Sequence, residues 1–316
     1  MTDADSAIRA EGLTKRFPGV TAVDRLSFTA VAGEIFGLVG SDGAGKTTTL
    51  RMLAGVLPAD EGSARVAGFD VMRDPEAVKP HISYMPQRFG LYEDLTVDEN
   101  IRFYADLFGI PRRQREERSA RLLAASGMME FRGRLAGQLS GGMKQKLGLT
   151  CALIHTPRVL LLDEPTTGVD PVSRRDFWRL LYLLLAEGVT ILISTAYLDE
   201  AERCHHLALL HEGRLLACDT PARLKSQLPG AVIAVISARP REVRDELTHA
   251  PGVSSLVMVG DGVHLVVDDA ERRLPELRQR LETSGLPFDR ISRVTPTIED
   301  LFVASVQTES GHERES

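Results

Sequence analysis

Apolar and polar residues alternate in the first part of the chain in a way that predicts paired strands followed by a buried one. Residues 7–33 alternate as antiparallel strands do. The run 35–39 is apolar throughout, which is typical of a strand buried on both faces, and it ends in a glycine-rich loop. A helix is expected over 47–57, where apolar residues share one face and Pro58 ends the pattern.

The middle of the chain alternates between helical periodicity and short apolar runs. Residues 90–150 look helical, and Thr96-Val97-Asp98-Glu99 has the form of a capping box at a helix start. The pattern predicts helices over 101–107, 114–126, 173–187 and 198–204, and buried strands over 159–162 and 189–194. Buried strands that alternate with helices predict an α/β core with a mostly parallel sheet.

A second, smaller domain is predicted after a change of composition near 221–230. The predicted elements there are strand 231–236, helix 240–249, strand 253–259, strand 263–267, helix 270–284 and strand 288–294. This β-α-β-β-α-β order is that of a ferredoxin-like α+β domain, and Gly260-Asp261-Gly262 is a good hairpin turn. A short helix over 297–306 closes the domain, and the polar residues 307–316 are expected to be disordered.

Length, charge and cysteine content limit the classes of protein that fit. A chain of 316 residues suits one large domain and one small domain. Its formal net charge of -6 is unlike the basic excess of most nucleic-acid-binding proteins. Three cysteines without Cys-x-x-Cys spacing fit a reducing compartment better than a disulfide framework or a zinc site. No run approaches the ~20 apolar residues of a membrane-spanning helix, so another chain must supply any membrane part.

The loop after the first buried strand carries a phosphate-binding motif. It matches G-x-x-x-x-G-K-[ST] between a strand and a helix, the context that this motif requires. Glycines let backbone N–H groups point inward at phosphate oxygens, and the helix N-terminus adds positive partial charge. Lys46 is expected to neutralise the β- and γ-phosphates, and Thr47 to offer its hydroxyl to Mg²⁺. The motif and the residue after it are Gly40, Ser41, Asp42, Gly43, Ala44, Gly45, Lys46, Thr47 and Thr48.

Two carboxylates follow the buried strand 159–162. Asp163 emerges at the C-terminal end of the strand, where α/β sheets place their ligand sites, and is expected to hold Mg²⁺. Glu164 is placed to orient and deprotonate an attacking water. Without the phosphate loop, Glu164 would be interpreted as an exposed carboxylate at a strand end. With that loop, the two motifs predict a P-loop nucleoside triphosphatase.

A third motif narrows the class. Leu139-Ser140-Gly141-Gly142-Met143-Lys144-Gln145 resembles the signature motif of ABC ATPases, and it lies between the other two motifs, as that family requires. Physically it is a second phosphate-binding helix start, where Ser140 and the N–H groups of Gly141 and Gly142 can grip a γ-phosphate. The resemblance implies that this motif acts in trans, so that two domains sandwich two ATP molecules head to tail.

The resemblance extends to three further positions. Gln87, in Tyr84-Met85-Pro86-Gln87, looks like the Q-loop glutamine, which contacts Mg²⁺ or the attacking water and relays to the membrane subunit. Asp170 looks like the D-loop aspartate, which crosses the dimer interface. Phe17 looks like the aromatic residue that stacks on adenine. The alternative for Phe17 is an ordinary core position, because aromatic side chains bury well.

The resemblance assigns residues 7–222 to a nucleotide-binding domain with a helical subdomain at about 88–157. Within it, 91–95 is expected to form part of the groove that receives a helix of the membrane subunit. Residues 223–306 resemble the accessory domain of drug and polysaccharide exporter ATPases. Pro296-Thr297-Ile298-Glu299-Asp300-Leu301-Phe302 is similar to the Pro-Thr-Leu-Glu-Asp-Val-Phe string near the ends of such chains. An unrelated α+β appendage is the alternative.

The family pattern breaks at one position. Its expected form is Ser-Thr-His-Tyr-Leu-Asp-Glu-Ala, whereas Ala196 stands here in place of the switch histidine. Alanine cannot contact the γ-phosphate or hold the water beside Glu164, and His205 and His206 lie too far along the chain to substitute. One interpretation is a slow site paired with a paralogous domain that has the histidine. The other is a homodimer in which the remaining groups suffice. We favour the first, because loss of one positioned catalytic group usually costs orders of magnitude in rate.

The resemblance therefore implies an ATP-binding and ATP-hydrolysing subunit of an ABC exporter. It implies ATP and Mg²⁺ as ligands, a transmembrane permease and a second nucleotide-binding domain as partners, and a place on the cytoplasmic face of the cell membrane. Nucleic acid is not an expected partner. One alternative is a soluble ABC ATPase that acts on nucleic acid or ribosomes. Another is a small-molecule kinase, which would not need the motif 139–145.

Overall fold

The computed structural model describes residues 6–315, with side chains described as far as Gln307. It divides into two compact units, one of residues 6–197 and 204–218, the other of residues 198–203 and 219–315. The division into domains 7–222 and 223–306 stays a prediction, because the compact units group 198–203 with the later residues and change over at Asp219.

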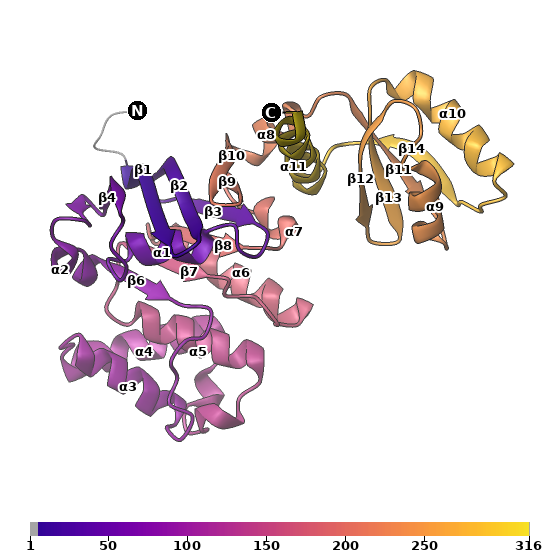
Figure 1. Ribbon diagram of the computed structural model, residues 1–316. Coiled ribbons are helices and arrows are strands. Elements are labelled where there is room, and N and C mark those ends of the chain that lie inside the picture. Colours follow the sequence, from indigo (N-terminus) through magenta and orange to yellow (C-terminus); the bar gives the residue numbers. More distant parts are fainter. Residues whose placement is uncertain (1–5, 316) are drawn as a thin grey trace. The chain divides into compact units, whose positions relative to one another are not determined.

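A mostly parallel six-stranded sheet forms the centre of the first unit (Figure 1). Its order is β10-β9-β3-β8-β7-β6, and neighbours from β9 to β6 pair in parallel. Strands β3 and β7 are entirely buried, which explains why their residues are apolar up to Gly40 and Asp163 at the C-terminal ends. The strands are β3 Ile35–Gly40, β6 Ile82–Met85, β7 Val159–Asp163, β8 Thr190–Thr195, β9 His206–His211 and β10 Arg214–Asp219.

A second sheet, antiparallel and of order β2-β1-β4-β5, also packs on helix α1, which contacts the parallel sheet as well. Strands β1 and β2 pair from Ser6↔Val31 to Phe17↔Val20, which confirms the antiparallel pair predicted for 7–33. The bounds are β1 Ser6–Phe17, β2 Val20–Val31, β4 Glu61–Val66, β5 Phe69–Asp70, α1 Lys46–Leu53 and α2 Pro75–Val78.

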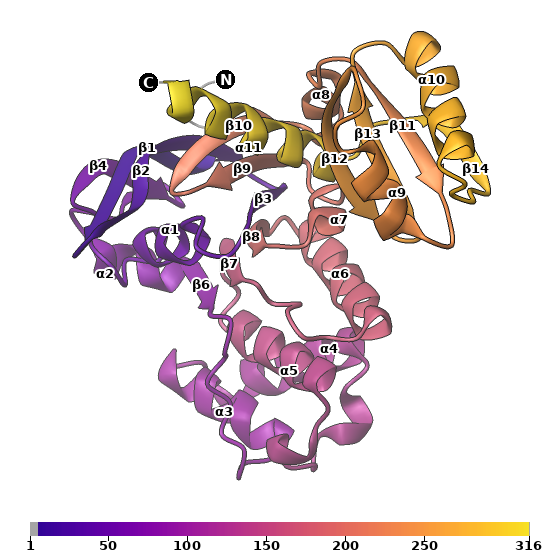
Figure 2. The ribbon, with the colours of Figure 1, turned by 45° about the vertical axis from the view of Figure 1, so that its right-hand side comes forward.

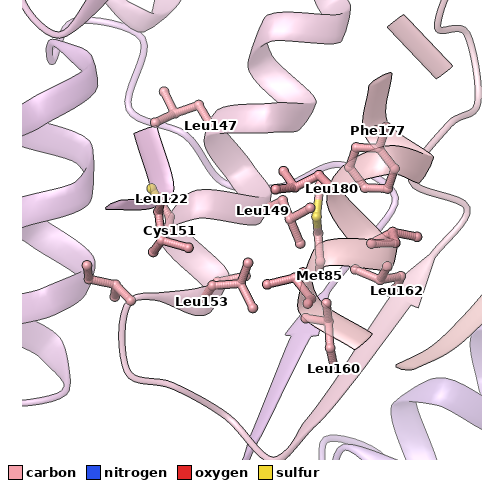
Figure 3. Packing of buried hydrophobic residues seen from close by; sticks show 14 of the residues in the cluster. Met85, Leu122, Leu147, Leu149, Cys151, Leu153, Leu160, Leu162, Phe177 and Leu180 are labelled. Atoms are coloured by element: carbon pink, nitrogen blue, oxygen red, sulfur yellow. The ribbon is translucent and has the colours of Figure 1, made fainter. Parts of the chain in front are cut away.

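Helices α3, α4 and α5 gather at one end of the first unit, below the sheet in Figure 1. The predicted capping box is present, since Thr96 and Glu99 bond each other's backbone N–H at the start of α3. Figure 3 shows how residues of α5, β6, β7 and α6 form one hydrophobic core. The bounds are α3 Val97–Leu107, α4 Arg112–Ser126, α5 Gly141–Leu153 and α6 Pro171–Ala186, with 3₁₀ turns at Lys79–His81, Met129–Phe131 and Ala136–Gln138.

The second unit contains a ferredoxin-like fold, drawn in orange and yellow in Figure 2. Its sheet has the order β12-β13-β11-β14 with every neighbouring pair antiparallel, and α9 and α10 pack on it. This confirms the predicted β-α-β-β-α-β arrangement. The bounds are α7 Leu198–Ala201, α8 Pro221–Ser226, β11 Ala231–Ile236, α9 Pro240–Leu247, β12 Val253–Val259, β13 Gly262–Val267, α10 Ala270–Thr283, β14 Arg290–Val294 and α11 Ile298–Glu315.

Most predicted elements differ from the structure by a few residues at one end or both, for example helix α3, which begins at Val97 rather than 101. Helix α1 ends at Leu53 rather than 57, because Gly55 follows with φ +67° and breaks the helical backbone. Helix α7 stops at Ala201 rather than 204. Helix α11 continues to Glu315, so the backbone of 307–315 is helical where disorder was expected, since no proline stops the helix after Val306. Residue 316 lies outside the described residues.

Among the described residues, no helix combines the length and apolar character needed to cross a membrane.

Candidate functional site

The phosphate loop leaves the buried strand β3 and holds Lys46 almost fully buried. The Lys46 ammonium donates to the carbonyl oxygens of Gly40 at 2.8 Å and Ser41 at 2.9 Å. It also lies 3.0 Å from Glu164 Oε1. Only 3% of the Lys46 side chain is exposed, so this cation is desolvated and compensated entirely by fixed oxygens. It is therefore aimed at the inside of the loop, where the sequence predicted a phosphate contact.

Two glycines allow the loop its shape. Gly45, the N-cap of α1, has φ +94°, and a Cβ there would lie 2.4 Å from the carbonyl oxygen of Ala22. Gly43 has φ +80°. No side chain caps the first N–H groups of α1, whereas the starts of α3 and α5 are capped by Thr96 and Ser140. The start of α1 thus presents uncapped donors, as anion-binding helix termini do.

Asp163, at the end of β7, accepts hydrogen bonds from three hydroxyl groups. Thr47 Oγ1 and Ser194 Oγ donate to its Oδ1 at 2.9 Å each, and Tyr84 OH donates to its Oδ2 at 3.1 Å. Burial raises the pKa of Tyr84 to about 12, with the Asp163 charge adding to the effect. The tyrosine therefore stays a neutral donor. The parallel register, which pairs Asp163 with Ser194, brings these groups together.

Glu164, the next residue, is one of the few non-glycine residues with a left-handed backbone, at φ 48°. Its N–H donates to Ser194 Oγ at 3.0 Å. Its carboxylate bonds Lys46 with one oxygen, and with the other it accepts from Gln87 Nε2 at 3.3 Å and Thr167 Oγ1 at 3.4 Å. Left-handed backbone outside glycine concentrates at functional sites. The carboxylate predicted to activate water is held directly beside the phosphate loop.

A cavity of about 930 Å³ opens over the phosphate loop and extends to Phe17. Phe17 is 42% exposed, and Lys15 Nζ lies 5.8 Å from the centre of its ring. The alternative of an ordinary core phenylalanine is therefore wrong. The predicted residues that line the cavity are Phe17, Asp42, Gly43, Ala44, Gly45, Lys46, Thr47, Thr48, Gln87 and Glu164.

Sequence reasoning missed four residues that line the same cavity: Val20, Thr21, Ala22 and Glu212. The first three follow the tight turn between β1 and β2, and Glu212 lies in the turn between β9 and β10. That turn is fixed to β2, because Asp24 N–H donates to the Gly213 carbonyl at 2.8 Å. Their residue types give no indication that they line a binding cavity. Only the pairing of distant strands brings them to the cavity.

The predicted signature residues and Asp170 do not line this cavity. Ser140 is exposed and caps α5 by accepting from Met143 N–H at 3.3 Å. Gly142 is buried against α6, where a Cβ would lie 2.5 Å from Ser173. Asp170 caps α6 by accepting from Val172 and Ser173 N–H groups, and the Ser173 contact is the main cause that lowers its pKa. Both helix starts are ordered, and a role in trans stays a prediction.

Ala196 is exposed directly after the buried Thr195 at the end of β8. Strand β8 lies between β3 and β7, so position 196 emerges beside the phosphate loop and Asp163. The two later histidines contact the opposite end of β3. His205 Nδ1 accepts from Ile35 N–H at 3.2 Å, and His206 Nδ1 lies 2.7 Å from Glu34. Neither replaces a side chain at 196.

The residues around Asp163 fit Mg²⁺. This cation prefers oxygen ligands and is usually held by one or two carboxylates together with substrate phosphates. Asp163 Oδ1 and Thr47 Oγ1 lie 2.9 Å apart, and Thr47 and Gln87 both line the cavity. The described residues hold no cluster of three or more His, Cys, Asp or Glu that could bind a metal without a substrate.

Comparisons with known proteins agree with this geometry. A family model described as "ABC transporter" matches residues 23–167. "Nod factor export ATP-binding protein I" of Paraburkholderia xenovorans (strain LB400) is 39% identical over 280 residues, which are 88% of this chain and 91% of that protein. "Probable multidrug ABC transporter ATP-binding protein YbhF" of Escherichia coli (strain K12) is 46% identical over 95% of this chain, which spans only 52% of that relative's length.

A solved structure resembles the chain as well. It is described as the "ADP conformation of MJ1267, an ATP-binding cassette of an ABC transporter". It is 26% identical to this chain, with a TM-score of 0.61, and the match covers 68% of this chain and 91% of that one.

Proposed function

This chain belongs to the family of ABC transporter ATP-binding proteins, and we propose that it binds and hydrolyses ATP to drive export through a separate membrane-spanning permease. The observation that carries the proposal is the contact of Lys46 with Glu164 at 3.0 Å inside a phosphate loop whose helix start is uncapped. It joins the phosphate-binding cation to the carboxylate that would activate water.

The chemistry follows from the residues present. The loop N–H groups and Lys46 bind the phosphates, which weakens the contact of Lys46 with Glu164 and frees that carboxylate to accept a proton from water. Gln87, which donates to Glu164, orients the same water. Asp163 and Thr47 would hold Mg²⁺, which would neutralise the charge on the phosphate oxygens. The side of Phe17 that faces the cavity stacks on adenine.

The exposed turn at Ser140 completes the site of a second nucleotide-binding domain. It lies outside the cavity of its own chain, and Ser140 and Gly141 are exposed at the start of a helix, where a phosphate can bind. Two domains facing head to tail bring each turn against the other's ATP. Asp170, at the exposed start of α6, faces the same junction.

We also propose that this chain's own site is slow and that its partner is a paralogue with an intact switch histidine. Position 196 emerges beside Asp163, where a histidine would reach a γ-phosphate, and alanine offers no donor there. Export places the chain on the cytoplasmic face of the cell membrane. The permease docks near Tyr92, which is 47% exposed on the segment 91–95.

The test is ATP turnover by the purified full chain and by Ala196→His, with Ala196→Leu as a control of similar bulk and no donor. We expect slow turnover that rises about tenfold or more in the histidine variant only. Fast turnover that the histidine leaves unchanged would contradict the slow site. A chain that binds no ATP would contradict the function itself. Glu164→Gln should trap ATP in a dimer, and ATP-bound monomers at micromolar concentration would count against the sandwich for this chain alone.

A further inference from the structure

Backbone hydrogen bonds join the segment 93–95, which follows β6, to residues 136–137, which lead into Ser140. Gly137 N–H donates to the Glu93 carbonyl at 2.9 Å, and Ala136 N–H donates to the Leu95 carbonyl at 2.8 Å. A Cβ at position 137 would lie 3.2 Å from that Glu93 oxygen, so glycine permits the close approach. The backbone at Glu93 is therefore fixed beside the approach to the signature turn.

Asn100 fixes the same segment from the other side. Its side chain is fully buried, at 0% exposure. It accepts from Tyr92 N–H at 2.9 Å and donates to the carbonyl oxygens of Tyr92, Leu95 and Thr96 at 3.0, 3.2 and 2.9 Å. A buried amide with four backbone contacts allows the loop little freedom. The backbone that carries the Glu93 side chain is therefore held in place from both sides.

Lys144 lies on the first turn of α5, four residues after the N-cap Ser140. A cation is unfavourable at a helix N-terminus, because that end already carries positive partial charge. Glu93 offsets it: Glu93 Oε1 lies 2.6 Å from Lys144 Nζ, with 66% and 33% of the two side chains exposed. The hydrogen bond from Lys144 is the main cause that lowers the pKa of Glu93, so the Glu93 carboxylate is ionised at neutral pH.

We propose that the Glu93–Lys144 pair sets how strongly the turn at Ser140 holds the γ-phosphate of a facing ATP. Lys144 adds positive potential to a phosphate-binding helix start, and Glu93 cancels most of it. In this proposal both are positioning residues, which act through the electrostatic field at the turn rather than by contact with the nucleotide. The inference rests on the ATP sandwich of the proposed function, and it assigns a regulating charge pair to that site.

Removing one partner at a time gives opposite results under this proposal. The native pair has no net charge, Glu93→Gln leaves +1 beside the turn, and Lys144→Gln leaves -1. Because ATP is an anion, the first variant should bind the facing nucleotide more tightly and the second more weakly, each by about threefold at low salt. The double variant should return to the native value. If the pair has only a structural role and holds the segment 93–95 on α5, both single variants break the same ion pair and both weaken ATP binding.

The experiment uses the full chain with Glu164→Gln as parent, since this variant should hold ATP without hydrolysis. The ATP concentration for half-maximal dimer formation is measured by light scattering at about 50 mM and 300 mM salt, where screening should shrink both shifts. Arg112→Gln and Glu116→Gln serve as matched controls, because they remove the same charges from an exposed pair on α4. They should leave the midpoint unchanged.

The outcomes separate the two proposals. Shifts of opposite sign that fade with salt support the charge pair. A dimer whose midpoint moves in the same direction in both single variants, or in neither, overturns the charge pair and leaves the sandwich standing. A parent that stays monomeric with ATP bound contradicts a sandwich of two copies of this chain, and it overturns the charge pair as argued for that sandwich.

Discussion

The buried pair of Lys46 and Glu164 should respond very differently to loss of its two members. Lys46→Met removes the cation, and the Glu164 carboxylate then keeps only the long contacts from Gln87 at 3.3 Å and Thr167 at 3.4 Å. Glu164→Gln removes the charge of the acid, but Lys46 keeps two carbonyl acceptors at 2.8 and 2.9 Å. The first change leaves a buried ion poorly compensated, and the second does not.

The expected costs follow from exposure and from the remaining partners. Breaking a fully buried pair costs about 3–5 kcal/mol. The Glu164 side chain is 12% exposed and keeps two donors, so we expect about 2–3 kcal/mol for Lys46→Met. Glu164→Gln should cost about 1 kcal/mol, because a glutamine oxygen can still accept from Lys46. The double variant should be more stable than the sum of the two single-variant costs predicts, with a coupling energy of about 1–2 kcal/mol.

A single tryptophan makes the measurement specific to the unit that holds the site. Trp178 is the chain's one tryptophan, and it is buried in α6 in the core of the first unit. Urea unfolding followed by its fluorescence therefore reports the first unit, without a contribution from the second. The buffer should contain EDTA and no nucleotide, so that ligand binding does not add to stability.

Two results would refute this reasoning. Equal destabilisation by both single variants would mean that the loop carbonyls do not hold Lys46. Additive costs in the double variant would mean that Lys46 and Glu164 do not interact in the folded protein. A matched comparison is Lys146→Met, which removes the partly exposed partner of Asp176 in the same unit and should cost about 1 kcal/mol or less.

Three further predictions concern other parts of the chain. Phe17→Ala should raise the KM for ATP about tenfold and change kcat little, while Phe17→Tyr keeps a stacking ring, as initial rates over a range of ATP would measure. Thr96→Ala should lower the free energy of unfolding of the first unit by about 1 kcal/mol, read from Trp178 fluorescence, because the capping box loses its side-chain acceptor. Hydrogen bonding to Arg273 lowers the pKa of Asp268 from 3.8 to about 2, so its stabilisation is complete above pH 4 and lost as pH falls toward 2. Hydrogen exchange in β11 should show an acid-induced loss of protection that Asp268→Asn flattens.

The motifs and the order of elements could be predicted because they depend on local sequence. The phosphate loop, for example, needs glycine where Gly45 adopts φ +94° against the Ala22 carbonyl, and no larger residue fits there. The capping box at Thr96 and the hairpin turn at Gly260-Asp261 are likewise encoded by consecutive residues. The order β-α-β-β-α-β follows from the alternation of hydrophobic patterns, and so does the fold of the second unit.

What could not be predicted depends on long-range pairing. Glu212 lines the cavity because β9 pairs with β3 and the turn after β9 bonds β2, contacts that no local pattern specifies. Residues 198–203 belong to the second unit because Glu202 accepts from Ile298 N–H at 3.2 Å and pairs with Lys225 at 2.6 Å, far along the chain. The contact of Glu93 with Lys144 has the same character.

The left-handed backbone of Glu164 restricts how this protein can change over evolutionary time. Such a conformation costs an L-residue about 1–2 kcal/mol, and only glycine, asparagine and aspartate enter it readily. In a relative that no longer hydrolyses ATP, the glutamate is not needed for chemistry, and its replacement can also relieve the backbone strain. Such relatives should carry glycine, asparagine or aspartate at this position, and valine or isoleucine hardly ever. The residue that replaces the glutamate in such relatives would then reflect the backbone conformation at this position rather than a new function.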